Sequence, residues 1–263
     1  MTGEPNVTSA DGVLTLAVST AANGTAMNPG AVDQAADALA ELLSGARDER
    51  VILLVGKGKN FCAGGDVASF AAAADRSDFV RDLAVRMHRM MDLMVCSGRP
   101  VVVAAKGWAA GAGMSFTLHG DVVVGGTSTR LRPAYSGIGL SPDGGMTWTL
   151  PRIVGAARAR GIILTNRVIS AQEALDWGIL SEIVDDDQVD ARAREIAVDL
   201  AAGPSEALQT TARQLRADPS TTLVEQFATE TRDIARLVGE PEGIEGVNAF
   251  VEKRKPVWNR EHG

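Results

Sequence analysis

Short apolar runs alternate with helical patterns through the first two-thirds of the chain, and this alternation limits the possible folds more than any other feature. The runs that predict buried strands are Gly12–Val18, Arg50–Val55, Val101–Ala105 and Asp121–Val124. Helical periodicity lies between them, and parallel strands need crossover connections of that kind. The pattern therefore predicts an α/β core with parallel strands.

The first predicted helices have clear ends and apolar faces. Asn28 and Pro29 are typical of a helix N-cap followed by proline at the first helical position, and Gly45 stands where this helix should stop. An apolar stripe between residues 79 and 94 predicts another helix. We expect the methionines of that stripe to be core residues.

The pattern becomes helical after residue 150. Candidate helices lie near 155–164, 171–177, 187–202, 204–217, 221–238 and 242–253. The helical end indicates a smaller second layer or an arm that contacts a neighbouring subunit. We place the boundary near residue 200, between residues 1–200 and residues 201–263.

Composition excludes several classes of protein. With 45% hydrophobic and 22% charged residues, the 263-residue chain has an ordinary globular composition. The net charge of −7 provides no basic face for nucleic acid, and the longest apolar runs are far too short for a membrane span. The N-terminus shows no secretory signal and two cysteines form no disulfide framework, so we expect a cytoplasmic protein. The histidines and cysteines have no metal-ligand spacing.

Two glycine-rich loops each follow a predicted strand. Residues 61–66 have the sequence FCAGGD, and residues 107–113 have the sequence GWAAGAG and open a predicted short helix. Glycine lets a ligand approach backbone N–H groups, and N–H groups at a helix start have no partner within the helix. Two such groups that converge would form an oxyanion hole. Neither loop has the spacing of a dinucleotide fingerprint or a P-loop, and ordinary tight turns are the alternative.

Several ordered segments resemble the crotonase superfamily, also called the enoyl-CoA hydratase/isomerase superfamily. They are Phe61–Val67, Lys106–Asp121, Gly139–Pro151, Ser170–Asp185 and Ala249–Trp258. The resemblance implies a spiral of repeated ββα units in residues 1–200, which carry the acyl-CoA site. It implies a helical C-terminal region in residues 201–263 that covers the site and supports a homotrimer or homohexamer.

The resemblance also implies a substrate carried as an acyl-CoA thioester, with no separate cofactor. The backbone N–H groups of Gly65 and Ala112 would hold the thioester oxygen, and alanine at 112, where the family has glycine, keeps its N–H. Residues 68–80 would lie near the acyl group. Substrate contacts are implied for Ala63, Asp66, Val67 and Tyr135, and contacts with the CoA phosphates for Lys253 and Lys255.

Residues near the implied hole separate the reactions of the family. Hydratases of the family hold a water between two glutamates, whose positions fall on Ser115 and Tyr135 here, so hydration is disfavoured. Isomerase branches carry a carboxylate after a proline, as in Pro142-Asp143, and one carboxylate suffices for a proton shift. The resemblance therefore favours an enoyl-CoA isomerase with Asp143 as a catalytic residue. A hydratase, another crotonase-type reaction and a non-catalytic acyl-CoA binder are the alternatives.

The singled-out residues also have other interpretations. Asp143 could cap a helix that starts at Gly144, because aspartate is a favoured N-cap. Ser115 and His119 lie on one helix face and could form a nucleophile and its base, although Ser115 lacks an elbow motif. A loop cap is the alternative for Asp66, and a solvated tail is the alternative for Lys253–Lys255.

Overall fold

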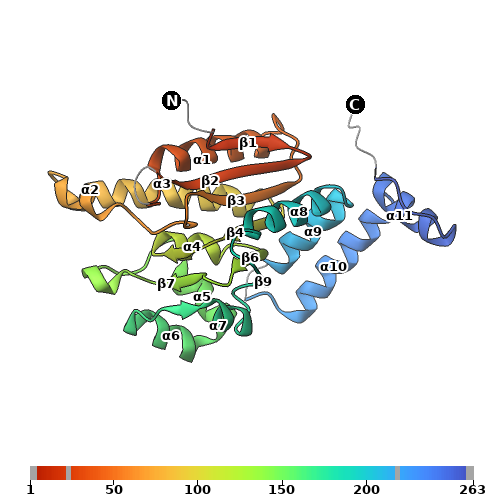
Figure 1. Ribbon diagram of the computed structural model, residues 1–263. Helices are drawn as coiled ribbons and strands as arrows, with labels where there is room; N and C mark the ends of the chain where they lie inside the picture. Colours follow the sequence, from red (N-terminus) through yellow and green to blue (C-terminus); the bar gives the residue numbers. More distant parts are fainter. Residues whose placement is uncertain (1–4, 22–24, 217–219, 259–263) are drawn as a thin grey trace.

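The computed structural model describes residues 5–21, 25–216 and 220–258, and within these ranges it has two β-sheets (Figure 1). The larger sheet contains β1 (Val7–Ala10), β2 (Val13–Thr20), β3 (Val51–Lys57), β4 (Val101–Ala105), β6 (Val122–Gly126) and β9 (Glu182–Val184). These strands lie side by side in that order; β1 is antiparallel to β2, and the other pairs are parallel. The predicted parallel core is confirmed.

Apolar side chains fill both faces of the larger sheet. On β2, Leu14 and Leu16 belong to the core on one face, whereas Val13 belongs to the core on the other face. The same alternation continues on β3, where Ile52 and Leu53 point to opposite cores. Central parallel strands that are buried on both faces need helices on both sides.

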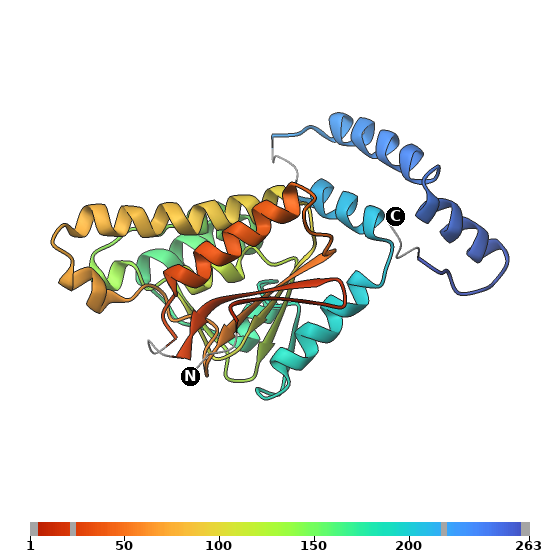
Figure 2. The ribbon, with the colours of Figure 1, turned by 90° about the horizontal axis from the view of Figure 1, so that it is seen from above.

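Helices α1 and α3 cover one face of this sheet. α1 (Pro29–Leu43) begins after Asn28, whose side chain accepts a hydrogen bond from the Ala31 N–H, so the predicted cap is confirmed. α3 (Arg76–Cys96) lies beside α1 (Figure 2). The methionines that it buries are Met87, Met90, Met91 and Met94. Their predicted place in the core is confirmed.

Helix α8 (Val189–Ala201) covers the opposite face with small side chains. The residues that it buries against the sheet are Val189, Ala193, Ala197 and Ala201. These positions are four residues apart, so they share one face of the helix. Their small volume lets the α8 backbone approach β3 and β4 closely.

A smaller sheet completes the spiral. β5 (Trp108–Ala110) pairs in parallel with β7 (Arg130–Arg132), and β7 pairs antiparallel with β8 (Ile169–Ser170). Strand β4 of the larger sheet is followed by β5, and β6 is followed by β7, before a helix returns the chain to the larger sheet. The expected α/β spiral of ββα units is therefore confirmed.

The C-terminal part of the described chain is helical. The remaining helices are α2 (Val67–Ala72), α4 (Ala112–Thr117), α5 (Met146–Val154), α6 (Ala156–Thr165), α7 (Ala171–Asp176), α9 (Ser205–Leu215), α10 (Leu223–Leu237) and α11 (Pro241–Val251), with a 3-10 turn at Ser136–Ile138. α10 and α11 extend away from the sheets (Figures 1 and 2). The helices predicted after residue 150 are confirmed, and the boundary near residue 200 stays a prediction. Among the described helices, none has the length and apolarity to cross a membrane.

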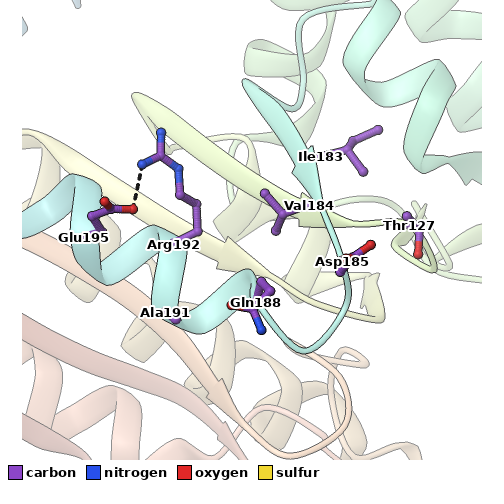
Figure 3. Close-up of a pocket in the computed structure, with 8 residues that line it drawn as sticks. All are labelled: Thr127, Ile183, Val184, Asp185, Gln188, Ala191, Arg192 and Glu195. Atoms are coloured by element: carbon purple, nitrogen blue, oxygen red, sulfur yellow. Dashed lines mark hydrogen bonds and ion pairs between the residues drawn. The ribbon is translucent and has the colours of Figure 1, made fainter.

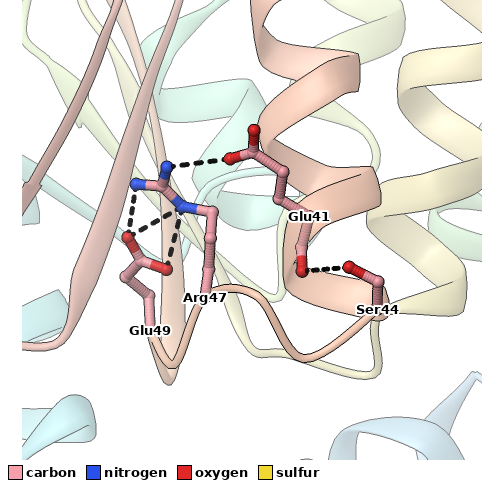
Figure 4. A network of polar contacts seen from close by, with 4 residues as sticks. All are labelled: Glu41, Ser44, Arg47 and Glu49. Carbon is pink, nitrogen blue, oxygen red and sulfur yellow. Dashed lines mark hydrogen bonds and ion pairs between the residues drawn. The ribbon is translucent and has the colours of Figure 1, made fainter.

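A polar network joins the end of α1 to the start of β3. The Arg47 guanidinium donates to the Glu49 carboxylate at 2.6 Å and to Glu41 at 3.2 Å (Figure 4). The Glu49 side chain is only 4% exposed. Burial acts to raise the pKa of Glu49, but its hydrogen bonds, above all that from Arg47, outweigh burial and hold this pKa below its usual value. The network therefore fixes the entry to the strand that precedes the first glycine loop.

Candidate active site

Main-chain contacts join the two glycine loops. The Cys62 N–H donates to the Trp108 carbonyl at 3.1 Å, and the Ala110 N–H donates to the Cys62 carbonyl at 2.9 Å. Gly64 has a φ of +97°, and a β-carbon there would lie 3.0 Å from the Ala110 oxygen. Glycine at position 64 thus permits both the backbone conformation and the close approach. The two loops form one continuous backbone surface.

Two backbone N–H groups of these loops, those of Gly65 and Ala112, donate to no other group in the described ranges. Ala112 is the first residue of α4, where a helix provides no acceptor for its own N–H. Both residues line one cavity of about 410 Å³. Unpaired donors beside one cavity can stabilise negative charge that develops on a ligand oxygen.

The rest of the cavity wall is mostly apolar. Its larger apolar side chains are Met27, Val67, Phe70, Val80, Leu83, Met87, Ile138 and Leu140. Phe70 makes an edge-to-face contact with Phe79, with ring centroids 6.1 Å apart. Phe70 and Val80 thus bring the predicted segment 68–80 to the cavity. A cavity of this kind can bury an apolar group of a ligand.

Asp143 is the one carboxylate among the described residues that line the cavity. The Tyr135 hydroxyl donates a 2.5 Å hydrogen bond to Asp143 Oδ1. The Ser115 hydroxyl donates to the Asp143 main-chain oxygen at 2.9 Å and lies 3.4 Å from the Tyr135 hydroxyl. The structure therefore brings Asp143, which matches the isomerase carboxylate of the resembled family, together with Ser115 and Tyr135, which stand at the positions of the two hydratase glutamates.

The interpretation of Asp143 as a helix cap is wrong. α5 begins at Met146 after Gly145, and no side chain caps it. Gly144 and Gly145 have φ values of +60° and +74°, so the backbone turns in the left-handed region before the helix starts. This turn delays the helix by two residues relative to the expected start at Gly144, and it leaves the Asp143 side chain at the cavity.

Two histidines hold the peptide groups that follow Asp143. The Gly144 N–H donates to His88 Nε2 at 3.0 Å, and His119 Nε2 lies 3.1 Å from the Gly144 carbonyl oxygen. Burial lowers the pKa of His119, so its ring is neutral and its Nε2–H can donate to that carbonyl. The role of His88 could not be predicted from the sequence, because no local spacing relates α3 to this turn.

The nucleophile-and-base interpretation of Ser115 and His119 is also wrong. Each side chain is used by the Asp143–Gly144 backbone, and no hydrogen bond joins the two in the described structure. Burial raises the pKa of Cys62 to about 12, so this thiol is a packing group. No cluster of three metal-binding side chains occurs within the described ranges, and His262 lies outside them.

The other predicted contact residues lie in different places. Ala63 and Val67 line the cavity. Asp66 caps α2, because its carboxylate accepts from the Ala68 N–H at 3.1 Å and from Ser69 Oγ at 2.6 Å. The hydrogen bond from Ser69 lowers the pKa of Asp66. Lys253 and Lys255 are exposed after α11, and neither lines the cavity.

A second hollow of about 700 Å³ lies beside β9 and α8 (Figure 3). Its Arg192 donates to Glu195 and to Glu182, each at 2.7 Å, so the guanidinium is already neutralised. Residues of the glycine loops do not line it. We therefore assign the candidate active site to the cavity that holds Gly65, Ala112 and Asp143.

Comparisons with known proteins agree with this geometry. The family model described as enoyl-CoA hydratase/isomerase matches residues 10–261. The chain is 36% identical over 214 residues to the 1,2-epoxyphenylacetyl-CoA isomerase of Escherichia coli K12, covering 80% of each chain. It is 38% identical over 219 residues to a Rhodobacter capsulatus protein named "Probable enoyl-CoA hydratase", covering 83% of this chain and 84% of that one. The crystal structure of an enoyl-CoA hydratase from Polaromonas sp. JS666 matches with a TM-score of 0.89 and 30% identity, covering 96% of this chain and 98% of that one.

Proposed function

The chain belongs to the enoyl-CoA hydratase/isomerase family, and we propose that within this family it acts as an isomerase that moves a carbon–carbon double bond of an acyl-CoA. The observation that carries the proposal is the position of Asp143. It is the one carboxylate among the described lining residues of a cavity that also holds two unpaired backbone donors. Such a site can form a thioester enolate and return its proton elsewhere.

The backbone donors stabilise the charge of the intermediate. The thioester oxygen binds between the N–H groups of Gly65 and Ala112. When a proton leaves the carbon next to the thioester, negative charge develops on that oxygen. Each placed donor lowers the barrier by about 3 kcal/mol. Because the donors are backbone groups, alanine at position 112 supplies the same hydrogen bond as glycine.

Asp143 moves the proton. Starting from a 3-enoyl-CoA, its carboxylate takes a proton from C2, and the electron pair forms the enolate. The enolate then collapses as C4 takes the proton back, so the double bond lies between C2 and C3 and the carboxylate is ionised again. No atom is gained or lost, so one acid–base group is sufficient.

The described residues of the cavity wall provide no second carboxylate, and this argues against hydration as the main reaction. Addition of water across a double bond needs one group to activate the water and another to deliver a proton. In the hydratases of the family two glutamates supply these two groups, and in this chain Ser115 and Tyr135 stand at their positions. Ser115 Oγ donates to a main-chain oxygen, and Tyr135 remains a phenol because burial and the Asp143 charge raise its pKa. Neither is available as a base.

The apolar wall and the family together define the substrate class that we propose. An acyl group without charge fills the wall beside Phe70 and Leu83, and the CoA portion extends out of the cavity. Lys253 and Lys255 would bind the CoA phosphates from a neighbouring subunit, since the cavity of the same protomer includes neither. Coenzyme A is part of the substrate, and no separate cofactor is proposed. The proposed setting is the cytoplasm.

The experiment that tests the proposal compares two substrates and one variant. An absorbance assay follows the gain of the 2-enoyl thioester chromophore from 3-hexenoyl-CoA, and its loss from 2-hexenoyl-CoA. We expect the first reaction, and we expect Asp143→Asn to lower its rate by about 10²–10⁴ with little change in acyl-CoA affinity. Loss of the 2-enoyl chromophore alone would support a hydratase. Acyl-CoA binding without turnover of either substrate would favour a binder and overturn the proposal.

A further inference from the structure

The Tyr135 hydroxyl donates a hydrogen bond to one oxygen of Asp143, the only carboxylate among the described residues of the cavity wall. From this contact we infer that Tyr135 is a positioning residue, which fixes Asp143 Oδ1 so that Oδ2 alone exchanges the proton with the substrate. The inference rests on the proposed function for its catalytic consequence. It differs from the substrate contact that the family resemblance implies for Tyr135.

The direction of the hydrogen bonds supports this role. Tyr135 is the donor to Oδ1 at 2.5 Å, a length typical of a hydroxyl bound to an ionised carboxylate. Ser115 directs its own proton to the Asp143 main-chain oxygen, so it does not compete for the carboxylate. Burial first, and then the Asp143 charge, raise the pKa of Tyr135, so the phenol stays a donor throughout the ordinary pH range.

The backbone before Tyr135 is held in an unusual conformation. Ala134 has a φ of +68°, which an alanine rarely adopts. Its N–H donates to Asn166 Oδ1 at 2.7 Å, and the Arg132 side chain donates to the Asn166 main-chain oxygen at 3.2 Å. Strain of this kind persists only where the surroundings enforce it. The end of α6 thus sets the direction from which the phenol reaches Asp143.

A fixed Oδ1 determines how the proton moves. A carboxylate that rotates freely can take a proton on one oxygen and return it from either. With Oδ1 bound to Tyr135, the proton enters and leaves through Oδ2, so C2 and C4 must present the same face to one atom. The phenol is a hydrogen-bond donor to the carboxylate, and a variant without the hydroxyl loses this donor.

The test is the pH profile of kcat/KM for Tyr135→Phe with 3-hexenoyl-CoA. We expect the acid limb to move upward, since the hydrogen bond that Tyr135 donates to the carboxylate is lost. We expect kcat to fall by about tenfold to a hundredfold and KM to change little, because the ring still fills its space. Ser115→Ala is the comparison: Ser115 contacts the Asp143 main-chain oxygen and the Tyr135 hydroxyl but not the carboxylate, so kcat can change while the acid limb should stay in place. Arg81 shares the cavity wall, and His88 and His119 contact Gly144. These groups are the same in parent and variant.

A second measurement does not depend on turnover. In protein labelled with ¹³C at aspartate carboxyls, the resonance lost in Asp143→Asn identifies the Asp143 carboxyl, and its titration midpoint is compared in parent and Tyr135→Phe. An upward shift in the variant supports the inference even if no acyl-CoA is converted, in which case the proposed function alone fails. An unchanged midpoint, or a variant with the parent's rate and acid limb on a converted substrate, would overturn the role of Tyr135.

Discussion

Cys62 and Ala109 pair in an isolated parallel β-bridge, which binds together the two loops that supply the unpaired N–H groups of the cavity. The first loop follows β3 and the second follows β4. Neither loop alone can therefore fix the position of its N–H group relative to the other N–H group. The distance between the donors is thus set by main-chain hydrogen bonds of a rigid sheet. Substitutions that separate the loops should damage the site without touching Asp143.

Gly113→Ala should separate the loops. A β-carbon at position 113 would lie 2.0 Å from the Cys62 carbonyl oxygen, which is backbone and cannot move aside alone. We expect a loss of about 1–3 kcal/mol of unfolding free energy and a clear loss of turnover. Gly161→Ala is the matched control, because a β-carbon there meets nothing within 4 Å and the residue lies inside α6. It should be neutral or stabilising in denaturant unfolding. Equal stabilities of the two variants would contradict the contact.

Gly65→Pro should remove one donor from the cavity. Proline lacks the N–H group, so stabilisation of the developing charge is lost and turnover should fall by about 10²–10³ or more. Gly65→Ala keeps the N–H, and its β-carbon would meet only the end of the Phe70 ring at 2.5 Å, which can move. Steady-state rates of both variants, with circular dichroism to confirm folding, test the assignment. A folded proline variant within a few-fold of the parent rate would refute it.

Arg47→Ala should destabilise the protein most near neutral pH. The pKa of Glu49 is lowered in the folded state, so its contribution to stability is present above the ordinary glutamate pKa and is lost as pH falls through the lowered value. Without Arg47 the buried carboxylate loses its main donor, and we expect a loss of about 1–3 kcal/mol at pH 7. At low pH, where Glu49 is protonated, the difference should shrink. Urea unfolding of both proteins between pH 3 and pH 7 measures it, and a constant difference would contradict this role for Arg47.

The exposed apolar face of α10 predicts self-association. Leu223, Phe227 and Ile234 are 67%, 55% and 70% exposed on this helix. Closed symmetry of copies of this chain would give a trimer or hexamer of roughly 80 or 165 kDa by light scattering. Phe227→Asp should shift the mass towards that of one chain, whereas Val85→Asp, on an exposed part of α3, should not. A parent protein that is monomeric at micromolar concentration would refute the prediction.

The sequence predicted best the features that depend on neighbouring residues. Asn28 caps α1 by accepting a hydrogen bond from the N–H of Ala31, three residues later, and Pro29 is the first residue of the helix. Helix α8 is recognisable from its own spacing. The turn after Asp143 could not be predicted in this way, because the left-handed conformations of Gly144 and Gly145 depend on contacts elsewhere. His88 accepts from a peptide group 56 residues later in the chain. Only the packing of α3 against the cavity brings the two together.

Helix α10 needs contacts with another surface to be stable as a helix. None of its side chains is buried, and it is joined to α9 by polar contacts: Gln214 donates to Asp233 at 2.9 Å, and Arg236 donates to Thr210 at 3.2 Å. An isolated helix of 15 residues is marginal in water. The sheets and their covering helices should therefore fold first, and the arm should become fully helical only at concentrations at which another surface covers it. Dilution would melt the arm while the spiral stays intact.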